Sequence, residues 1–174
     1  MKLSAIVIAG LALAPAAGAS AQGINDAQIA SIVVTANQVD IDAGKLAASR
    51  AANGEVRKFA RLMITDHTGV NKAAGVLVAK LKVMPEDNPT SQSLKSAGDK
   101  NLAQLKTLKG AAFDKAYVDH EVVYHQQVID ALDKILIPGA TNGELKALLI
   151  NVRPAFVAHL EHAKSLQSSV NKDR

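Results

Sequence analysis

The sequence predicts an all-α protein, built as an antiparallel four-helix bundle with an additional short crossover helix. Apolar residues recur every three or four positions through each long segment, which is the spacing of a helix face. The first two long segments are joined by a short break, as are the last two, so each pair should form an antiparallel hairpin. No strand pattern or internal repeat competes with this interpretation.

Residues 1–21 have the pattern of a secretory signal peptide. Lys2 precedes an apolar run from Leu3 to Leu13, and Ala19-Ser20-Ala21 forms a small-residue cleavage site. The run is too short to span a bilayer, and no later run is long enough. We therefore expect cleavage after Ala21, a periplasmic or secreted location, and one domain over residues 22–174. An uncleaved anchor is the alternative.

The composition excludes several classes of function. The chain has 48% hydrophobic and 21% charged residues and no cysteine, so disulfides and thiolate ligands are absent. Without Lys2 there are 19 basic and 16 acidic residues, a net charge of +3. The basic residues are scattered and no tryptophan is present, so we expect no nucleic-acid surface. A weak association with the anionic cell envelope fits this charge, and the sequence does not identify which proteins, if any, are partners.

The first hairpin begins near residue 25. Asn25 can cap a helix from Asp26 to about Arg50, and after the break at 51–54 Asn53 can cap a second helix that reaches about Lys82. The expected inward positions are Ile29, Ile32, Ala36, Val39, Ala43 and Leu46, followed by Phe59, Met63, Val70, Ala73, Leu77 and Leu81.

The crossover helix follows the clearest loop of the chain, Met84 to Pro89, where two prolines separate helices. The helix should run from about Thr90 to Leu108 and pack against the side or end of the bundle, because its apolar positions are sparse. Gly110 is expected to stop it.

The second hairpin pairs a helix from Phe113 to Ile137 with a helix from Gly143 to about Val170 that Asn142 can cap. Pro154 lies inside the last helix and should kink it. The expected inward positions are Phe113, Tyr117, Tyr124, Val128, Ala131, Leu132 and Ile135, followed by Leu145, Leu148, Leu149, Val152, Phe156, Leu160, Ala163 and Leu166. Two hairpins joined by a crossover give a ferritin-like bundle.

Charge-capable residues fall where this bundle should have its core. Glu121 lies near the middle of an apolar face and His125 one turn further on. With a rise of about 1.5 Å per residue, several polar residues lie within roughly one turn of the midpoint of their own helix. These residues are Asp40, Asp66, His67, Glu121, His125 and His159. All four long helices contribute, so the sequence predicts one polar layer across the bundle.

This layer predicts a transition-metal site. His67, His125 and His159 would bind the ion, and Glu121 and Asp66 would bind it or orient the histidines. Imidazoles with carboxylates suit zinc, iron or copper. The Glu-x-x-His motif of di-iron bundles is missing.

A purely structural network is the competing interpretation of the same residues. His159 alone fits a hydrogen-bonded core histidine, Asp66 fits a partner for arginine or backbone groups, and the shoulder position of Asp40 suits a solvated face. Glu121 and His125 on one buried stripe are harder to explain in this way, because burying an unpaired carboxylate costs several kcal/mol.

The chain also resembles a family of exported bacterial proteins, domain-of-unknown-function family 4142. The matching residues are Phe59-Ala60, Met63 and Asp66-His67-Thr68, then Phe113-Asp114, Tyr117 and His125, and finally His159-Leu160. The resemblance covers nearly all of the chain after the signal peptide. It implies the ferritin-like bundle and carries over His67, His125 and His159 as recurring histidines. His120 and His162 are additions in this sequence, at the edges of the inward-facing stripes of their helices.

Three functions remain open from the sequence. The first is metal binding or handling outside the cytoplasm, and the second is a structural or stress-related role in the cell envelope. An oxidase-like enzyme ranks last, because it needs a redox metal with an open coordination position. No catalytic residues are assigned, since neither a Ser-His-Asp order nor a glycine-rich phosphate loop is present.

Overall fold

The computed structural model describes residues 23–172, so the expected signal peptide lies outside the described residues. The described part is helical and contains no strand, which confirms the all-α bundle. Its elements are α1 (Asp26–Arg50), α2 (Gly54–Leu81), α3 (Pro89–Thr107), α4 (Gly110–Ala131), the π-helix η1 (Leu132–Leu136), α5 (Ile137–Gly139) and α6 (Gly143–Lys172). None of these helices combines the length and apolar character that crossing a membrane requires.

The first hairpin forms as the capping residues predict. The Asn25 side chain accepts the amide of Gln28, whose side chain bonds back to the Asn25 amide, and Asn53 caps α2. α4 secures the link between the two helices, because the buried Asp114 carboxylate accepts the amides of Ala52 and Asn53 at 2.9 and 2.7 Å.

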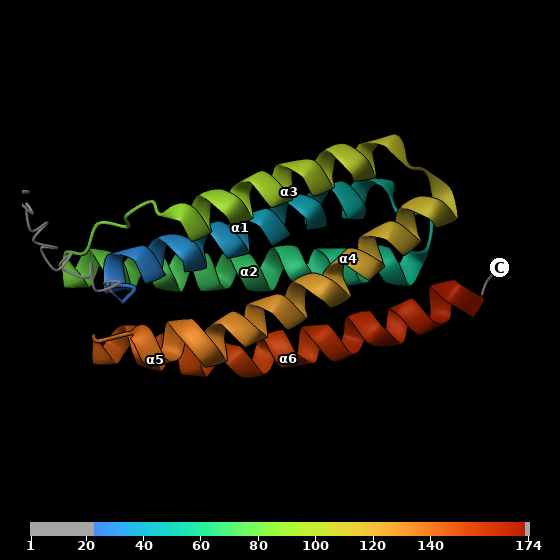
Figure 1. Cartoon of the computed structure of the whole chain (residues 1–174). Helices are drawn as coiled ribbons and strands as arrows, with labels where there is room; N and C mark the ends of the chain where they lie inside the picture. The colour runs from blue at the N-terminus through green and yellow to red at the C-terminus, as the bar shows by residue number, and fades with distance from the viewer. Residues whose placement is uncertain (1–22, 173–174) are drawn as a thin grey trace, which may run out of the picture.

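α3 lies along the side of α1 (Figure 1), as expected for the crossover helix. Gly98 allows the close approach, since a Cβ there would lie 2.8 Å from Val39. The prediction that Gly110 stops this helix is wrong. α3 ends at Thr107 with Leu108 in an extended conformation, and Gly110, at φ +56°, begins α4 instead.

The second hairpin pairs α4 with α6, but its first helix is not continuous α-helix to Ile137 as predicted. A π turn at Leu132–Leu136 interrupts it. A π turn inserts an extra residue and rotates the face that follows. Ile135, expected inward, is accordingly 52% exposed. Ala73 of α2 was also expected inward and is exposed, because it lies on the flank of a stripe whose centre is Ala74.

Near the π turn, Arg153 of α6 makes two bonds of 2.6 and 2.7 Å to the Asp133 carboxylate. α6 runs unbroken through Pro154 and curves gently in Figure 1. A sharp kink at this proline remains a prediction.

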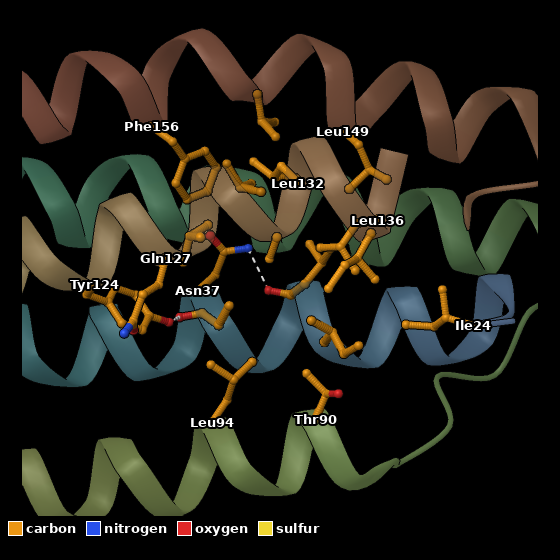
Figure 2. A pocket seen from close by; sticks show the side chains of 18 residues that line it. Ile24, Asn37, Thr90, Leu94, Tyr124, Gln127, Leu132, Leu136, Leu149 and Phe156 are labelled. Atoms are coloured by element: carbon orange, nitrogen blue, oxygen red, sulfur yellow. Dashed lines mark hydrogen bonds between the residues drawn. The ribbon is translucent and has the colours of Figure 1, made fainter. Parts of the chain in front are cut away.

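The core consists of two apolar clusters, one toward each end of the bundle. One contains Phe59, Met63, Phe113 and Tyr117, and the other contains Ile32, Leu132, Leu149 and Phe156. Each long helix carries at least one buried polar residue close to where the two clusters meet. The second cluster also borders a cavity, which Figure 2 shows from close by.

Candidate metal centre

Four helices place polar side chains in the layer between the two apolar clusters. α1 supplies Asp40, α2 supplies His67, α4 supplies Glu121 and His125, and α6 supplies His159. Each of these residues is at most 5% exposed. The helices bring them together because each residue lies near the middle of its helix and on the apolar side.

His67 is held in one tautomer by a fixed acceptor. Its Nδ1 lies 2.7 Å from Oδ1 of Asn37, and the amide nitrogen of Asn37 donates to the Val33 carbonyl at 2.8 Å. Because the amide oxygen can only accept, Nδ1 must carry the hydrogen. A neutral ring would then turn the Nε2 lone pair toward Oδ2 of Asp40, only 2.6 Å away, so this pair needs either a proton on Nε2 or a cation that both atoms bind.

His125 and His159 are held in the same manner. Nδ1 of His125 donates to the Glu121 carbonyl at 3.0 Å, and Nε2 of His159 donates to Oδ2 of Asp66 at 2.9 Å. In the neutral rings, the remaining nitrogens each carry a lone pair; they are Nε2 of His125 and Nδ1 of His159. Acceptors that fix the far nitrogen are the usual supports of metal-binding histidines.

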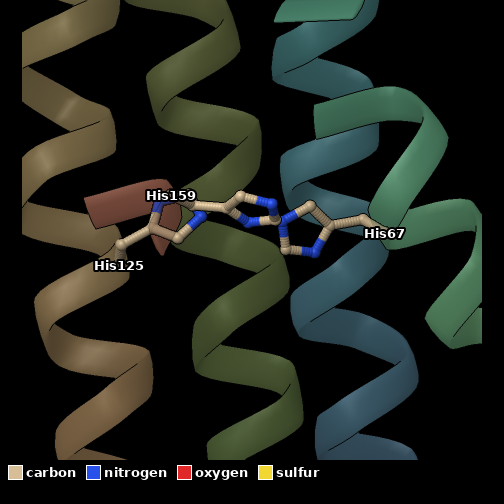
Figure 3. A group of neighbouring side chains, drawn as sticks. All are labelled: His67, His125 and His159. Carbon is tan, nitrogen blue, oxygen red and sulfur yellow. The ribbon is translucent and has the colours of Figure 1, made fainter. Parts of the chain in front are cut away.

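The free atoms of the layer are mostly acceptors, and the Tyr117 hydroxyl beside Glu121 is a donor among them. Among the described residues, no hydrogen-bond partner satisfies Nε2 of His67, Nε2 of His125, Nδ1 of His159, or the carboxyl oxygens of Asp40 and Glu121. The three imidazoles point toward one another (Figure 3), and one ligand atom from each lies within 4.8 Å of the others. Asp40, Glu121 and His125 form a second such group. Buried acceptors without donors require a cation, either a metal ion or protons.

The electrostatics of the layer match this requirement. Burial raises the pKa of Glu121 well above its ordinary value, and the neighbouring Asp40 carboxylate raises it further. Burial alone would raise the pKa of Asp40 too, but His67 and His125 outweigh it and hold that pKa below its ordinary value. Burial lowers the pKa of His125 to about 4. At neutral pH this ring is therefore neutral, as a metal ligand must be.

Aromatic rings close the layer on one side. The Phe156 ring lies 5.1 Å from the His67 ring and 6.2 Å from the rings of His125 and His159, measured between centroids. The Tyr124 hydroxyl donates to the Ala36 carbonyl at 2.8 Å and so locks its ring beside His125. These contacts keep water away from the lone pairs on this side.

The structure brings together His67, His125, His159 and Glu121 from the predicted set. Asp66 lies at the rim instead, where its side chain is 37% exposed and holds the far nitrogen of His159. The two additional histidines stay outside the layer. His162 is exposed beside Phe59, and His120 stacks on Tyr124.

Two residues of the site were not assigned a role there from the sequence. Asp40 was noted in the layer but given a solvated face as an equal alternative, whereas it is 1% exposed between two histidines. Asn37 was not identified at all. The signal for it was its place one helical turn before Asp40, on the same face of α1.

Comparisons with known proteins agree with the fold. A family model described as a domain of unknown function, DUF4142, matches residues 11–166. No curated protein matches the chain. CopM in its Cu(II)-bound form is 18% identical with a TM-score of 0.65, over 84% of this chain and 98% of CopM. A DUF305 protein described as secreted, from Streptomyces coelicolor, is 13% identical with a TM-score of 0.68, over 83% of this chain and 92% of its own. These likenesses show a shared fold.

Proposed function

We propose a function for this chain, which belongs to the DUF4142 family, from the chemistry of its own site: it is an exported protein that binds one transition-metal ion in its mid-bundle layer. One observation carries the proposal. Three buried imidazole nitrogens present lone pairs to the same space, and each ring is held from behind by an acceptor. Hydrogen bonding inside an ordinary core would supply donors to these atoms.

The donor set suggests which ions to test first. His67, His125 and His159 offer one set of three nitrogen ligands, and Asp40 and Glu121 offer oxygen ligands in a second set that shares His125. Such ligands suit Cu(II), zinc and Fe(II), whereas Cu(I) prefers sulfur. Ligand bonds near 2.0–2.2 Å separate neighbouring ligand atoms by roughly 3 Å. The distances of 2.6 and 3.6 Å from Oδ2 of Asp40 to the two histidines lie on either side of that value. Cu(II) comes first because the similarly folded CopM was solved with it.

Binding and handling of the ion fit this site better than catalysis. The layer is buried on all four helices, and the pair of His159 and the partly exposed Asp66 links it to the rim. A catalytic metal keeps an open position for substrate. We therefore propose that the ion enters past Asp66 and is then retained.

A structural network is the second candidate, and the raised pKa of Glu121 favours it. A protonated Glu121 can donate to Asp40, so protons can satisfy part of the layer without metal. In that case the layer fixes the packing of the four helices, and the protein is a structural component of the cell envelope.

Metal analysis of protein purified from its native compartment, without a metal-affinity tag, separates the two candidates. The proposal expects close to one equivalent of transition metal per chain. It also expects His125→Ala to lose the metal and His162→Ala, which changes an exposed histidine, to keep it. Protein that carries no metal from its compartment and takes up none of Cu(II), zinc or Fe(II) in titration would contradict the proposal.

A further inference from the structure

A cavity of about 130 Å³ lies beside the polar layer (Figure 2), within the apolar cluster that contains Ile32, Leu132, Leu149 and Phe156. Most of its wall comes from five elements, α1, α3, α4, η1 and α6. Tyr124 and Leu136 both line it, and they are separated by about 18 Å along the helix at the usual rise. The lining residues therefore follow the bundle axis, and the volume, which is below that of a cavity that holds one benzene, has room for a short chain.

The interior of the cavity offers nothing to a polar ligand. Its lining is almost wholly aliphatic and aromatic. The polar atoms of Asn37 and Tyr124, which also line it, already bond to Val33, His67 and Ala36. An engineered apolar cavity of about 150 Å³ stays dry and binds benzene or xenon, so a space of this size and chemistry favours hydrocarbon over water.

The cavity reaches the surface between α3 and η1. Thr90, Gln127 and Ile135 line it and are exposed. Ile135 is placed there by the π turn, which also aims Leu132 and Leu136 into the cavity wall. π turns inside helices are frequent at functional sites. This mouth therefore has a polar rim, with a hydroxyl and a carboxamide, above an apolar interior.

We propose that the cavity binds the alkyl chain of a single-chain amphiphile, with the chain along the bundle axis and the head group in solvent at the Thr90 and Gln127 rim. An apolar space whose lining follows the bundle axis matches a chain, and an open mouth matches a head group that keeps its water. The proposal does not depend on the metal site, although Asn37 and Phe156 border both.

Calorimetric titration with hexanoate and with hexyl glucoside, both below their micelle concentrations, tests the proposal on the purified protein, because a six-carbon chain suits the volume of the cavity. One molecule of each should bind per chain, because the two probes share only the alkyl chain. Chelator should leave this binding unchanged.

Two variants fill the cavity from different helices, Ala131→Leu on α4 and Ala36→Leu on α1. Each should weaken binding of both probes at least about tenfold, because the added side chain occupies the chain's space. Ala79→Leu adds the same atoms at an exposed position of α2 away from the cavity and should change nothing. Circular dichroism checks that each variant is folded.

Failure of both probes to bind would overturn the proposal, as would binding that both filling variants leave intact. Binding of benzene without binding of either hexyl probe would also overturn it, because the cavity would then take compact molecules and not chains.

Discussion

At the residue scale, the orientation of each imidazole depends on the acceptor behind it. Asn37 is the clearest case, since its amide oxygen faces Nδ1 of His67 and its amide nitrogen is fixed by Val33. With the acceptor removed, the ring is free to protonate Nε2, which then cannot bind metal.

Asn37→Leu should therefore weaken metal binding by about 10–100-fold, the usual effect of losing such a support. Asn71→Leu is the matched control, because Asn71 of α2 donates to the Val34 carbonyl of α1 and makes no such bond to a histidine. Competition with a metal-binding dye measures both affinities. Equal affinities for the two variants would show that Asn37 does not set the tautomer.

Sequence analysis could find Glu121 and His125 because a charge-capable residue on an apolar stripe is conspicuous. It could not place Asp40, which lies on the shoulder of its own helix. The rotation of α1 that buries Asp40 depends on contacts with other helices, such as the bond from Tyr124 to the Ala36 carbonyl. No pattern within α1 contains that information.

At the element scale, short connections are held by single carboxylates. Asp114 of α4 accepts hydrogen bonds from two amides in the link between α1 and α2.

Asp114→Ala should reduce the free energy of unfolding by about 1–3 kcal/mol, because both amides lose their acceptor. Asp99→Ala, which removes an exposed carboxylate paired with Lys95, should cost less than about 0.5 kcal/mol. Urea unfolding measures both, and similar losses would contradict this account.

Asp26 performs the same task at the other end of the bundle. It accepts the amides of Thr141 and Asn142 at 2.9 and 3.0 Å and the Thr141 hydroxyl. Partial burial opposes ionisation, but these bonds outweigh it and lower the pKa of Asp26 from its usual 3.8.

A lowered pKa in the folded state means that the ionised carboxylate stabilises the protein above pH 3.8 and that this contribution is lost as the pH falls through the folded value. The difference in free energy of unfolding between the parent and Asp26→Ala should therefore narrow as the pH is lowered from 6 to 3. Urea titrations across this range check it. A difference that stays constant or widens would contradict the assignment.

The sequence predicts that the connection from Met84 to Pro89 is the internal segment most sensitive to proteases. The structure limits the accessible part to the start of this connection. Met84 is 83% exposed, whereas the Glu86 amide bonds the Ala27 carbonyl and Asn88 is buried. Brief digestion with proteinase K should cut first between Val83 and Met84. A first cut at residues 140–142, which Asp26 holds, would show that the other connection is looser.

The starts of α1, α2 and α6 were predictable from capping residues, whereas the π turn was not. Asn25, Asn53 and Asn142 each carry a local signal, because one side chain satisfies the first amides of its helix. The segment Leu132–Leu136 contains no proline or glycine, and its apolar spacing suits an α-helix equally well. Its π turn depends on packing against the rest of the bundle.

At the scale of the whole molecule, the polar layer separates two apolar clusters that would otherwise form one core. The position of the layer was predictable, because antiparallel helices of similar length bring their midpoints together. Whether the layer contains an ion was not predictable, because the same residues also make a proton-bridged network. The two cases differ in how metal changes the stability of the fold.

Melting temperature with and without metal tests the central claim most directly. A ligand that binds only the folded state at 100 times its Kd adds about 2.7 kcal/mol, which for a chain of this size raises the melting temperature by about 5–10 °C. The parent and His162→Ala should show this rise with Cu(II) or zinc and lose it with chelator. His67→Ala, His125→Ala and His159→Ala should show neither change. A parent protein that melts at one temperature with chelator and with added copper, zinc or iron would contradict the metal site.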